Sequence, residues 1–116
     1  MGYHIHHSIV VTSWEKKHLE MAHEKAVEIF PQELVSEIQG SIRNGYKSFF
    51  VAPDGSKEGW KESDEMDLKR EEFMAWAKTA SSFDVWIDAV EIAFGGDEGD
   101  LNTRVVSHNE ETEGGE

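Results

Sequence analysis

Residues 4–12 have the sequence HIHHSIVVT, and residues 46–52 have the sequence YKSFFVA. Both runs are rich in β-branched and aromatic residues and end at turn or cap residues, which is typical of strands in the centre of a sheet. The second run follows Asn44-Gly45, a dipeptide that favours the two positive-φ positions of a type I′ turn. The sequence therefore predicts a hairpin in which residues 34–43 pair antiparallel with residues 46–52.

A two-residue loop also predicts the register of this hairpin and the face on which each side chain lies. It places Arg43 opposite Tyr46, Ser41 opposite Ser48, Gln39 opposite Phe50 and Ile38 opposite Val51. The residues expected on the core face are Ile5, His7, Ile9, Val11, Ile38, Ile42, Phe49 and Val51. Those expected on the other face are His4, His6, Ser8, Val10, Thr12, Gln39, Ser41, Arg43, Tyr46, Ser48 and Phe50. The second face should thus be a mixed surface of histidine, hydroxyl and aromatic groups.

Apolar spacing predicts helices over residues 14–30, with Ser13 as the N-cap, and over residues 64–80. Residues 83–94 favour a fourth strand with Trp86, Val90, Ile92 and Phe94 towards the core, and a helix over residues 84–93 is the alternative. The resulting order βαββαβ predicts an α+β, ferredoxin-like sandwich. In it a four-stranded antiparallel sheet carries two helices on one face, and the first and third strands are central. We expect one domain over residues 1–94 and an acidic, glycine-rich C-terminal extension over residues 95–116, in which Val105-Val106 is a candidate for a short added strand.

The composition limits the classes of partner. The chain has 116 residues, no cysteine and a formal net charge of -13. Residues 61–116 contribute most of this charge, with sixteen acidic and five basic side chains. Such a field repels nucleic-acid phosphates and suits a basic partner, although an acidic surface that only confers solubility is the simpler reading. The lack of cysteine, of a visible leader and of a long apolar run favours a cytoplasmic protein that does not enter a membrane.

Two histidine patterns could indicate a metal site or a catalytic motif. His4 and His6 project from one strand face roughly 6–7 Å apart, which suits a shared metal if a third ligand such as Glu91 is near. His6-x-Ser8 also resembles one half of the paired His-x-Ser/Thr motifs of 2H phosphoesterases, but the second motif is missing because Asn109 and Glu110 follow His108. We therefore predict polar surface histidines, with no metal site, no cofactor and no catalytic residue.

The predicted binding surface combines the mixed sheet face with a loop. Residues 53–60, PDGSKEGW, have two glycines, a tryptophan and charges of both signs, which is typical of a contact loop, although Trp60 alternatively closes the end of the helical layer. Tyr46 and Phe50 are placed as base-stacking aromatics are in RNA-recognition modules, but Arg43 alone accompanies them, which argues against a polynucleotide. A small nucleotide, a protein partner or self-association remains open. The predicted binding residues are His4, His6, Ser8, Gln39, Arg43, Tyr46, Ser48, Phe50, Asp54, Lys57 and Trp60.

Residues 2–13 and 44–60 resemble a group of small proteins from tailed phages and prophages, and the resemblance extends over residues 2 to about 100. The group has no assigned activity, so it implies a setting, the cytoplasm of an infected bacterium, and no site residue. In that setting we expect a non-catalytic, homo-oligomeric binding protein that engages a host or defence protein as an inhibitor. The alternatives are a sponge for a small nucleotide signal, a metal-dependent or 2H-like phosphodiesterase, and a structural component of the virion.

Overall fold

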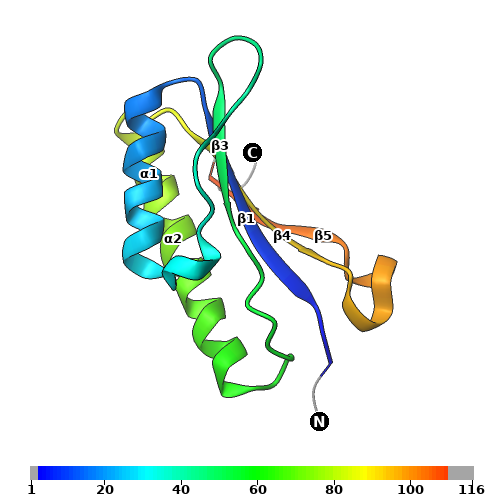
Figure 1. The fold of residues 1–116 in the computed structure, drawn as a ribbon. Coiled ribbons are helices and arrows are strands. Elements are labelled where there is room, and N and C mark those ends of the chain that lie inside the picture. The colour runs from blue at the N-terminus through cyan, green and yellow to red at the C-terminus, as the bar shows by residue number, and fades with distance from the viewer. Residues whose placement is uncertain (1–2, 110–116) are drawn as a thin grey trace, which may run out of the picture.

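The computed structural model describes residues 3–109, which form an α+β fold with two helices and a five-stranded antiparallel sheet (Figure 1). The strand order is β2-β3-β1-β4-β5, and both helices cover the same face of the sheet. Within this range no helix is long and apolar enough to span a bilayer. The elements are β1 (His6–Ser13), α1 (Lys16–Ile29), the 3-10 helix η1 (Gln32–Leu34), β2 (Gln39–Gly40), β3 (Lys47–Val51), α2 (Lys61–Ser82), β4 (Asp88–Phe94), the kinked 3-10 segment η2 (Gly96–Asn102) and β5 (Arg104–His108).

The centre of the sheet agrees with the sequence prediction. β1 pairs with β3 on one side and with β4 on the other, and every pairing is antiparallel. The expected four strands are joined by a fifth, β5, which contains Val105-Val106 and pairs with β4. The segment predicted as an extension thus contributes an edge strand to the sheet.

The core lies between the sheet and the two helices. Ile9 and Val11 point into it from β1, as alternation predicts. α1 buries Leu19, Ala22, Ala26 and Ile29, whose spacing of three and four residues places them on one side of the helix. Its N-cap is Glu15, two residues later than the predicted Ser13, whose hydroxyl instead accepts a hydrogen bond from the Glu15 N–H at 3.0 Å.

The hairpin has the predicted turn residues but not the predicted register. Asn44 and Gly45 both have positive φ, as expected of the dipeptide. Gln39 nevertheless pairs with Ser48, not with Phe50, because the chain leaves the ladder after Gly40 and forms a wider loop before Lys47. The prediction that Ile42 faces the core is therefore wrong, since its side chain lies in this loop and is 89% exposed.

The faces of β4 are reversed relative to the prediction. Ala89, Glu91 and Ala93 are buried on the helix side, so Val90, Ile92 and Phe94 point to the other face. Packing explains the reversal, because α2 buries large side chains against this strand and leaves room for alanines, and because Arg70 of α2 pairs with Glu91. Trp86 lies outside the strand and is half-exposed.

Candidate functional site

The sheet face opposite the helices carries a continuous row of apolar side chains. In the register, Val10 of β1 stands between Phe50 of β3 and Val90 of β4. Ile92 stands opposite Val105 of β5, and the ring of Phe94 lies against the His6 ring with centroids 5.5 Å apart. Directly opposed residues of neighbouring strands have Cβ atoms about 5 Å apart, and Val90, Ile92 and Phe94 lie on the same face of β4, so β4 connects the opposed pairs. We call this row the apolar strip, and it consists of Phe50, Val10, Val90, Ile92, Phe94 and Val105.

The apolar strip is open to solvent. Phe50 is 46% exposed, Val10 is 37% exposed and Val105 is 59% exposed. Large side chains on β3, β1 and β5 therefore meet water on a face that both helices leave uncovered (Figure 1), and those of β4 between them are half-buried. Scattered exposed apolar residues are common, but a connected row across a sheet is typical of a surface that binds something.

Two hollows flank Val10, so this face of the sheet is not flat. One, of about 530 Å³, lies between Val10 and Phe50 and reaches Gln39 and Glu37 at the β2 side. The other, of about 330 Å³, lies on the β5 side of Val10 and is lined by Val90, Asp88 and His108. Among the residues described, Glu37 and Asp88 supply the charge at these two hollows, and neither hollow is lined by lysine or arginine. The rim of the face is therefore acidic.

The structure brings together about half of the predicted binding residues. Gln39, Ser48 and Phe50 line the larger hollow, and His6 lies at the end of the apolar strip. Ser8 shares the face, but it is buried and its hydroxyl donates to the Val51 carbonyl at 2.7 Å. The sheet face thus offers a few polar groups beside an apolar surface.

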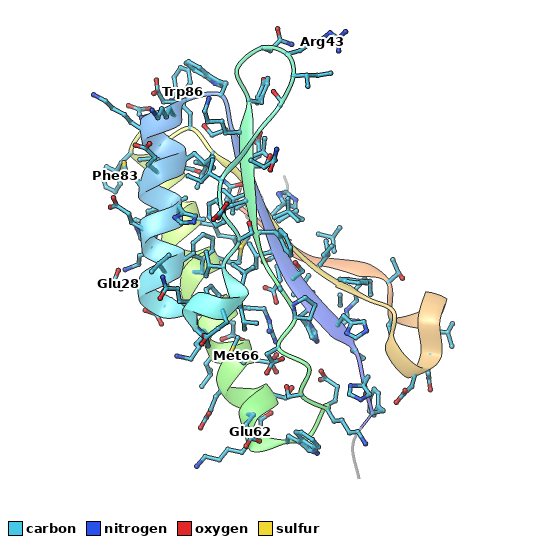
Figure 2. The ribbon with its side chains drawn as sticks, viewed as in Figure 1. Glu28, Arg43, Glu62, Met66, Phe83 and Trp86 are labelled. Carbon is cyan, nitrogen blue, oxygen red and sulfur yellow. The ribbon has the colours of Figure 1, made fainter. Side chains whose placement is uncertain are left out.

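The remaining predicted residues lie elsewhere. Arg43 is at the tip of the hairpin loop (Figure 2), and Tyr46 lines a separate hollow at the end of the sheet. Asp54 and Lys57 belong to the connection from β3 to α2, and Trp60 is the N-cap residue of α2. The loop and the sheet face are therefore two separate surfaces.

The start of β1 does not provide the considered metal site. The His4 N–H donates to Asp97 Oδ2 at 2.9 Å, which ties this end of the chain to η2. Glu91, the suggested third ligand, points to the helix side of the sheet, whereas His6 points to the open side. Within residues 3–109 no group of three or more His, Asp or Glu side chains is arranged to hold a metal ion.

Sequence reasoning missed the residues that β4 and β5 contribute, namely Val90, Ile92, Phe94, Val105 and His108. For the β4 residues, the signal that could have found them is the placement of Ala89 and Ala93 on one side of residues 89–94. Small residues on one side of a strand are typical of a face under a closely packed helix. That pattern would have turned the larger residues outward.

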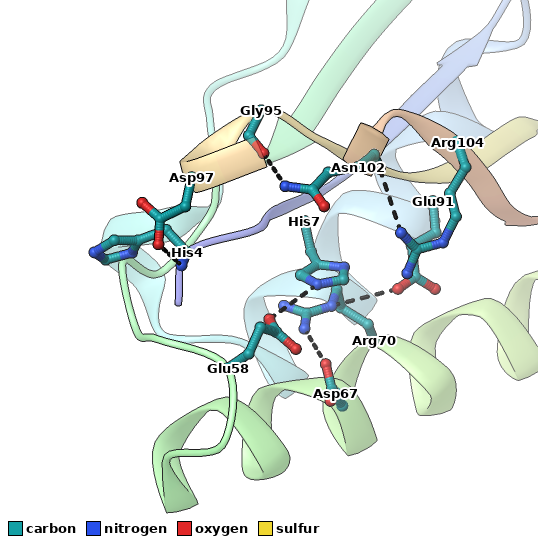
Figure 3. Close-up of polar contacts among 10 residues, drawn as sticks. All are labelled: His4, His7, Glu58, Asp67, Arg70, Glu91, Gly95, Asp97, Asn102 and Arg104. Atoms are coloured by element: carbon teal, nitrogen blue, oxygen red, sulfur yellow. Dashed lines mark hydrogen bonds and ion pairs between the residues drawn. The ribbon is translucent and has the colours of Figure 1, made fainter. Parts of the chain in front are cut away.

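Charged side chains form a buried network on the helix side of the sheet, shown in Figure 3. Arg70 is 3% exposed and Glu91 is 6% exposed, and the Arg70 Nε lies 3.4 Å from Glu91 Oε2. The same guanidinium donates to the Asp67 carboxylate, and His7 Nε2 lies 3.3 Å from Glu58 Oε2. We call these five residues the ionic cluster.

Burial is the largest influence on the pKa values of two members of the ionic cluster, Glu91 and His7. It raises the pKa of the Glu91 carboxyl above its ordinary value of 4.5, although the charge of Arg70 acts in the opposite direction. Burial, and then the charge of Arg70, lowers the pKa of His7 below its ordinary value of 6.5. Because Arg70 pairs with Glu91 and Asp67, and His7 lies within hydrogen-bond distance of Glu58, the ionic cluster holds α2 and the β3–α2 connection against the sheet, on the side opposite the apolar strip.

A scan against protein-family models, a search of curated proteins and a search of solved structures each returned no match for this chain. The candidate site is accordingly defined by the chain's own geometry.

Proposed function

We propose that this chain is a non-catalytic binding protein that docks another protein on its open sheet face. The observation that carries the proposal is the apolar strip. No helix covers this row, and burying its apolar surface against a partner would contribute a favourable free energy of binding. The hollows beside Val10 and Phe50 are large enough to receive side chains of that partner. We also assign the order β2-β3-β1-β4 to the ferredoxin-like arrangement, with β5 added at its edge.

The charge around the strip favours a basic partner over a second copy of the chain. Glu37 and Asp88 sit at the rim, and the whole chain carries a formal charge of -13. Two copies placed face to face would bring these carboxylates together without lysine or arginine from the lined hollows to offset them. A partner with apolar side chains inside a rim of lysine or arginine would match both the apolar strip and the carboxylates beside it.

The same charge argument favours a protein over a nucleotide. Phosphate groups are normally held by arginine, lysine or helix N-termini, and the residues described around the two hollows include no such cation. The resemblance to proteins of tailed phages directs the proposal to a bacterial host or defence protein, bound in the cytoplasm and inhibited by occupancy of one of its basic surfaces.

The test compares one substitution in the strip with one outside it. Phe50→Asp places a charge at the β3 end of the apolar strip, beside the larger hollow, and Leu68→Asp places the same charge on the outer side of α2, where Leu68 is 65% exposed. Captured partners from a bacterial lysate are identified, purified and titrated against all three proteins. We expect Phe50→Asp to weaken binding about a hundredfold and Leu68→Asp to change it less than threefold.

Salt and oligomeric state complete this experiment. Raising the salt concentration should weaken binding of the wild-type protein, because rim charges are screened. Equal binding by the wild type and Phe50→Asp would refute the proposal. So would light scattering that finds a stable wild-type dimer which Phe50→Asp dissociates, because the occupant of the face would then be a second copy.

A further inference from the structure

A third hollow, of about 340 Å³, lies at the end of the sheet where β1 leads into α1. Its walls include the indoles of Trp14 and Trp86 and the phenol of Tyr46, three residues that are far apart in the sequence. Trp86 is labelled near the N-terminal end of α1 in Figure 2. None of the residues of the apolar strip lines this hollow, although Asp88 lines both this hollow and the one on the β5 side of Val10.

The aromatic walls meet at an angle. The ring centroids of Trp14 and Trp86 are 5.2 Å apart, and their planes are inclined by 64°. Both indoles and the Tyr46 ring are about half-exposed, so much of their surface is available to a ligand. Aromatic rings that line a shared hollow at an angle to each other are the arrangement that proteins use to surround a cationic group.

Hydrogen bonds hold the backbone segments that carry the two tryptophans in place. The buried Ser13 hydroxyl donates to the Trp86 carbonyl, which ties the residue before Trp14 to Trp86. The Trp86 backbone N–H donates to His18 Nδ1 at 2.8 Å, which ties the same residue to α1. A ligand therefore does not have to order these segments when it binds.

The side-chain charge at the hollow is negative, because Asp88 lines it. Ser81 brings the last turn of α2, with the negative end of its helix dipole, and the start of α1 near Trp14 brings the positive end of its own dipole, so the two dipoles oppose each other here. Of the residues described around the hollow, none is lysine or arginine. One carboxylate beside three aromatic rings suits a large, weakly hydrated organic cation better than a metal ion, which needs several hard or nitrogen ligands.

We propose that this aromatic hollow binds an organic ammonium cation that carries methyl groups, with Trp14, Trp86 and Tyr46 around the methyls and Asp88 nearby as counter-charge. The cation reaches the hollow either as a free quaternary ammonium compound or as a methylated lysine side chain of a protein. The two sources share the trimethylammonium group that the aromatic rings would surround.

The test uses the four tryptophan indole N–H signals in two-dimensional NMR spectra of the isotope-labelled protein. Choline is titrated as the free cation, and its neutral carbon analogue 3,3-dimethylbutan-1-ol is titrated as the shape control. We expect choline to shift the Trp14 and Trp86 signals saturably and to leave those of Trp60 and Trp76 in place. The neutral analogue should bind at least tenfold more weakly, because the aromatic faces attract charge. A short peptide with trimethyllysine, compared with the unmodified peptide, distinguishes the sources: the tighter of choline and modified peptide is the preferred form.

Variants locate the site. Trp86→Ala and Tyr46→Ala should each weaken choline binding about tenfold, and Asp88→Asn should weaken it about threefold and reduce its dependence on salt. Trp60→Ala, which removes another half-exposed indole at the N-terminus of α2, should have no effect. Circular dichroism confirms that each variant is folded. Equal affinity for choline and its neutral analogue, or unchanged binding by both Trp86→Ala and Tyr46→Ala, would overturn the proposal.

Discussion

Substitution of Arg70 should be among the most damaging single changes in this protein. The guanidinium is 3% exposed and lies between two carboxylates, with its Nε 3.4 Å from Glu91 Oε2 and its Nη2 bonded to Asp67. Arg70→Met keeps a long apolar side chain and removes the charge, so Glu91 becomes a buried carboxylate without a counter-charge. Loss of one partner of a buried pair costs about 3–5 kcal/mol. We expect a value near the lower limit, about 3 kcal/mol at pH 7.5, because Glu91 can take up a proton.

The double variant Arg70→Met/Glu91→Gln tests whether the loss comes from the stranded charge. With both charges gone, we expect a total cost of about 1 kcal/mol, so that adding Glu91→Gln to Arg70→Met recovers about 2 kcal/mol of the loss. Arg43→Met is the matched control, because it removes an arginine from the exposed hairpin loop (Figure 2) and should change stability by less than about 0.5 kcal/mol.

Urea unfolding followed by far-ultraviolet circular dichroism measures these differences. With a slope of about 1.5 kcal/mol per molar urea, a 3 kcal/mol loss lowers the midpoint by about 2 M. The pH dependence has a definite sign. A carboxyl whose pKa is raised on folding binds more protons in the folded state, so its contribution to stability falls as the pH rises from 4.5 through the raised value. The deficit of Arg70→Met should therefore shrink at pH 5.

Two results would refute this reasoning. One is an Arg70→Met midpoint equal to that of Arg43→Met, which would mean that the buried pair contributes nothing. The other is a double variant no more stable than Arg70→Met, which would mean that the lost packing of the arginine stem, and not the stranded Glu91 charge, causes the loss.

Two further predictions concern His7 of the ionic cluster and the buried side chain of Asn109. Burial and the Arg70 charge lower the pKa of His7 below 6.5, so the folded state binds fewer protons there than the unfolded state, and stability is lost as the pH falls from 6.5 through the lowered value. His7→Gln should flatten this part of the stability curve relative to the wild type, whereas an equally steep curve in thermal unfolding between pH 7.5 and pH 5 would contradict the assignment. The buried Asn109 side chain accepts from the Ala89 N–H at 2.9 Å and donates to the Ile87 carbonyl at 2.8 Å. Asn109→Ala should cost about 2 kcal/mol and speed hydrogen exchange at the Ala89 amide, and an unchanged exchange rate there would count against this role.

The sequence predicted β1 well because only one of its two faces is apolar enough to be core. Ile9 and Val11 alternate with Ser8 and Thr12, and a strand with that contrast has one stable orientation. β4 lacks the contrast, since Ala89 and Ala93 alternate with Val90 and Ile92 and both sets are apolar. Its orientation is decided by side chains of α2, which packs on it in three dimensions, and single-strand patterns do not contain that information.

The hairpin and the aromatic hollow show what local sequence patterns cannot predict. Asn44-Gly45 correctly predicted two positive-φ residues, but the loop length depends on how far β2 remains paired, and β2 ends at Gly40. Alternation predicts that Tyr46 shares a face with Ser48 and Phe50, but it does not predict the hollow that Tyr46 lines with Trp14 and Trp86, because these residues come from separate segments of the chain. Local propensity predicts elements, whereas their meeting points follow from the packed fold.

The addition of β5 leaves a five-residue strand with exposed valines at the margin of the sheet in residues 3–109. A bare margin of this kind is a template on which further copies can line up into fibrils. Directly after it the sequence continues with Glu110 and Glu111 and, a little further on, Glu113 and Glu116. Clustered like charges that follow such a strand in the sequence oppose this growth.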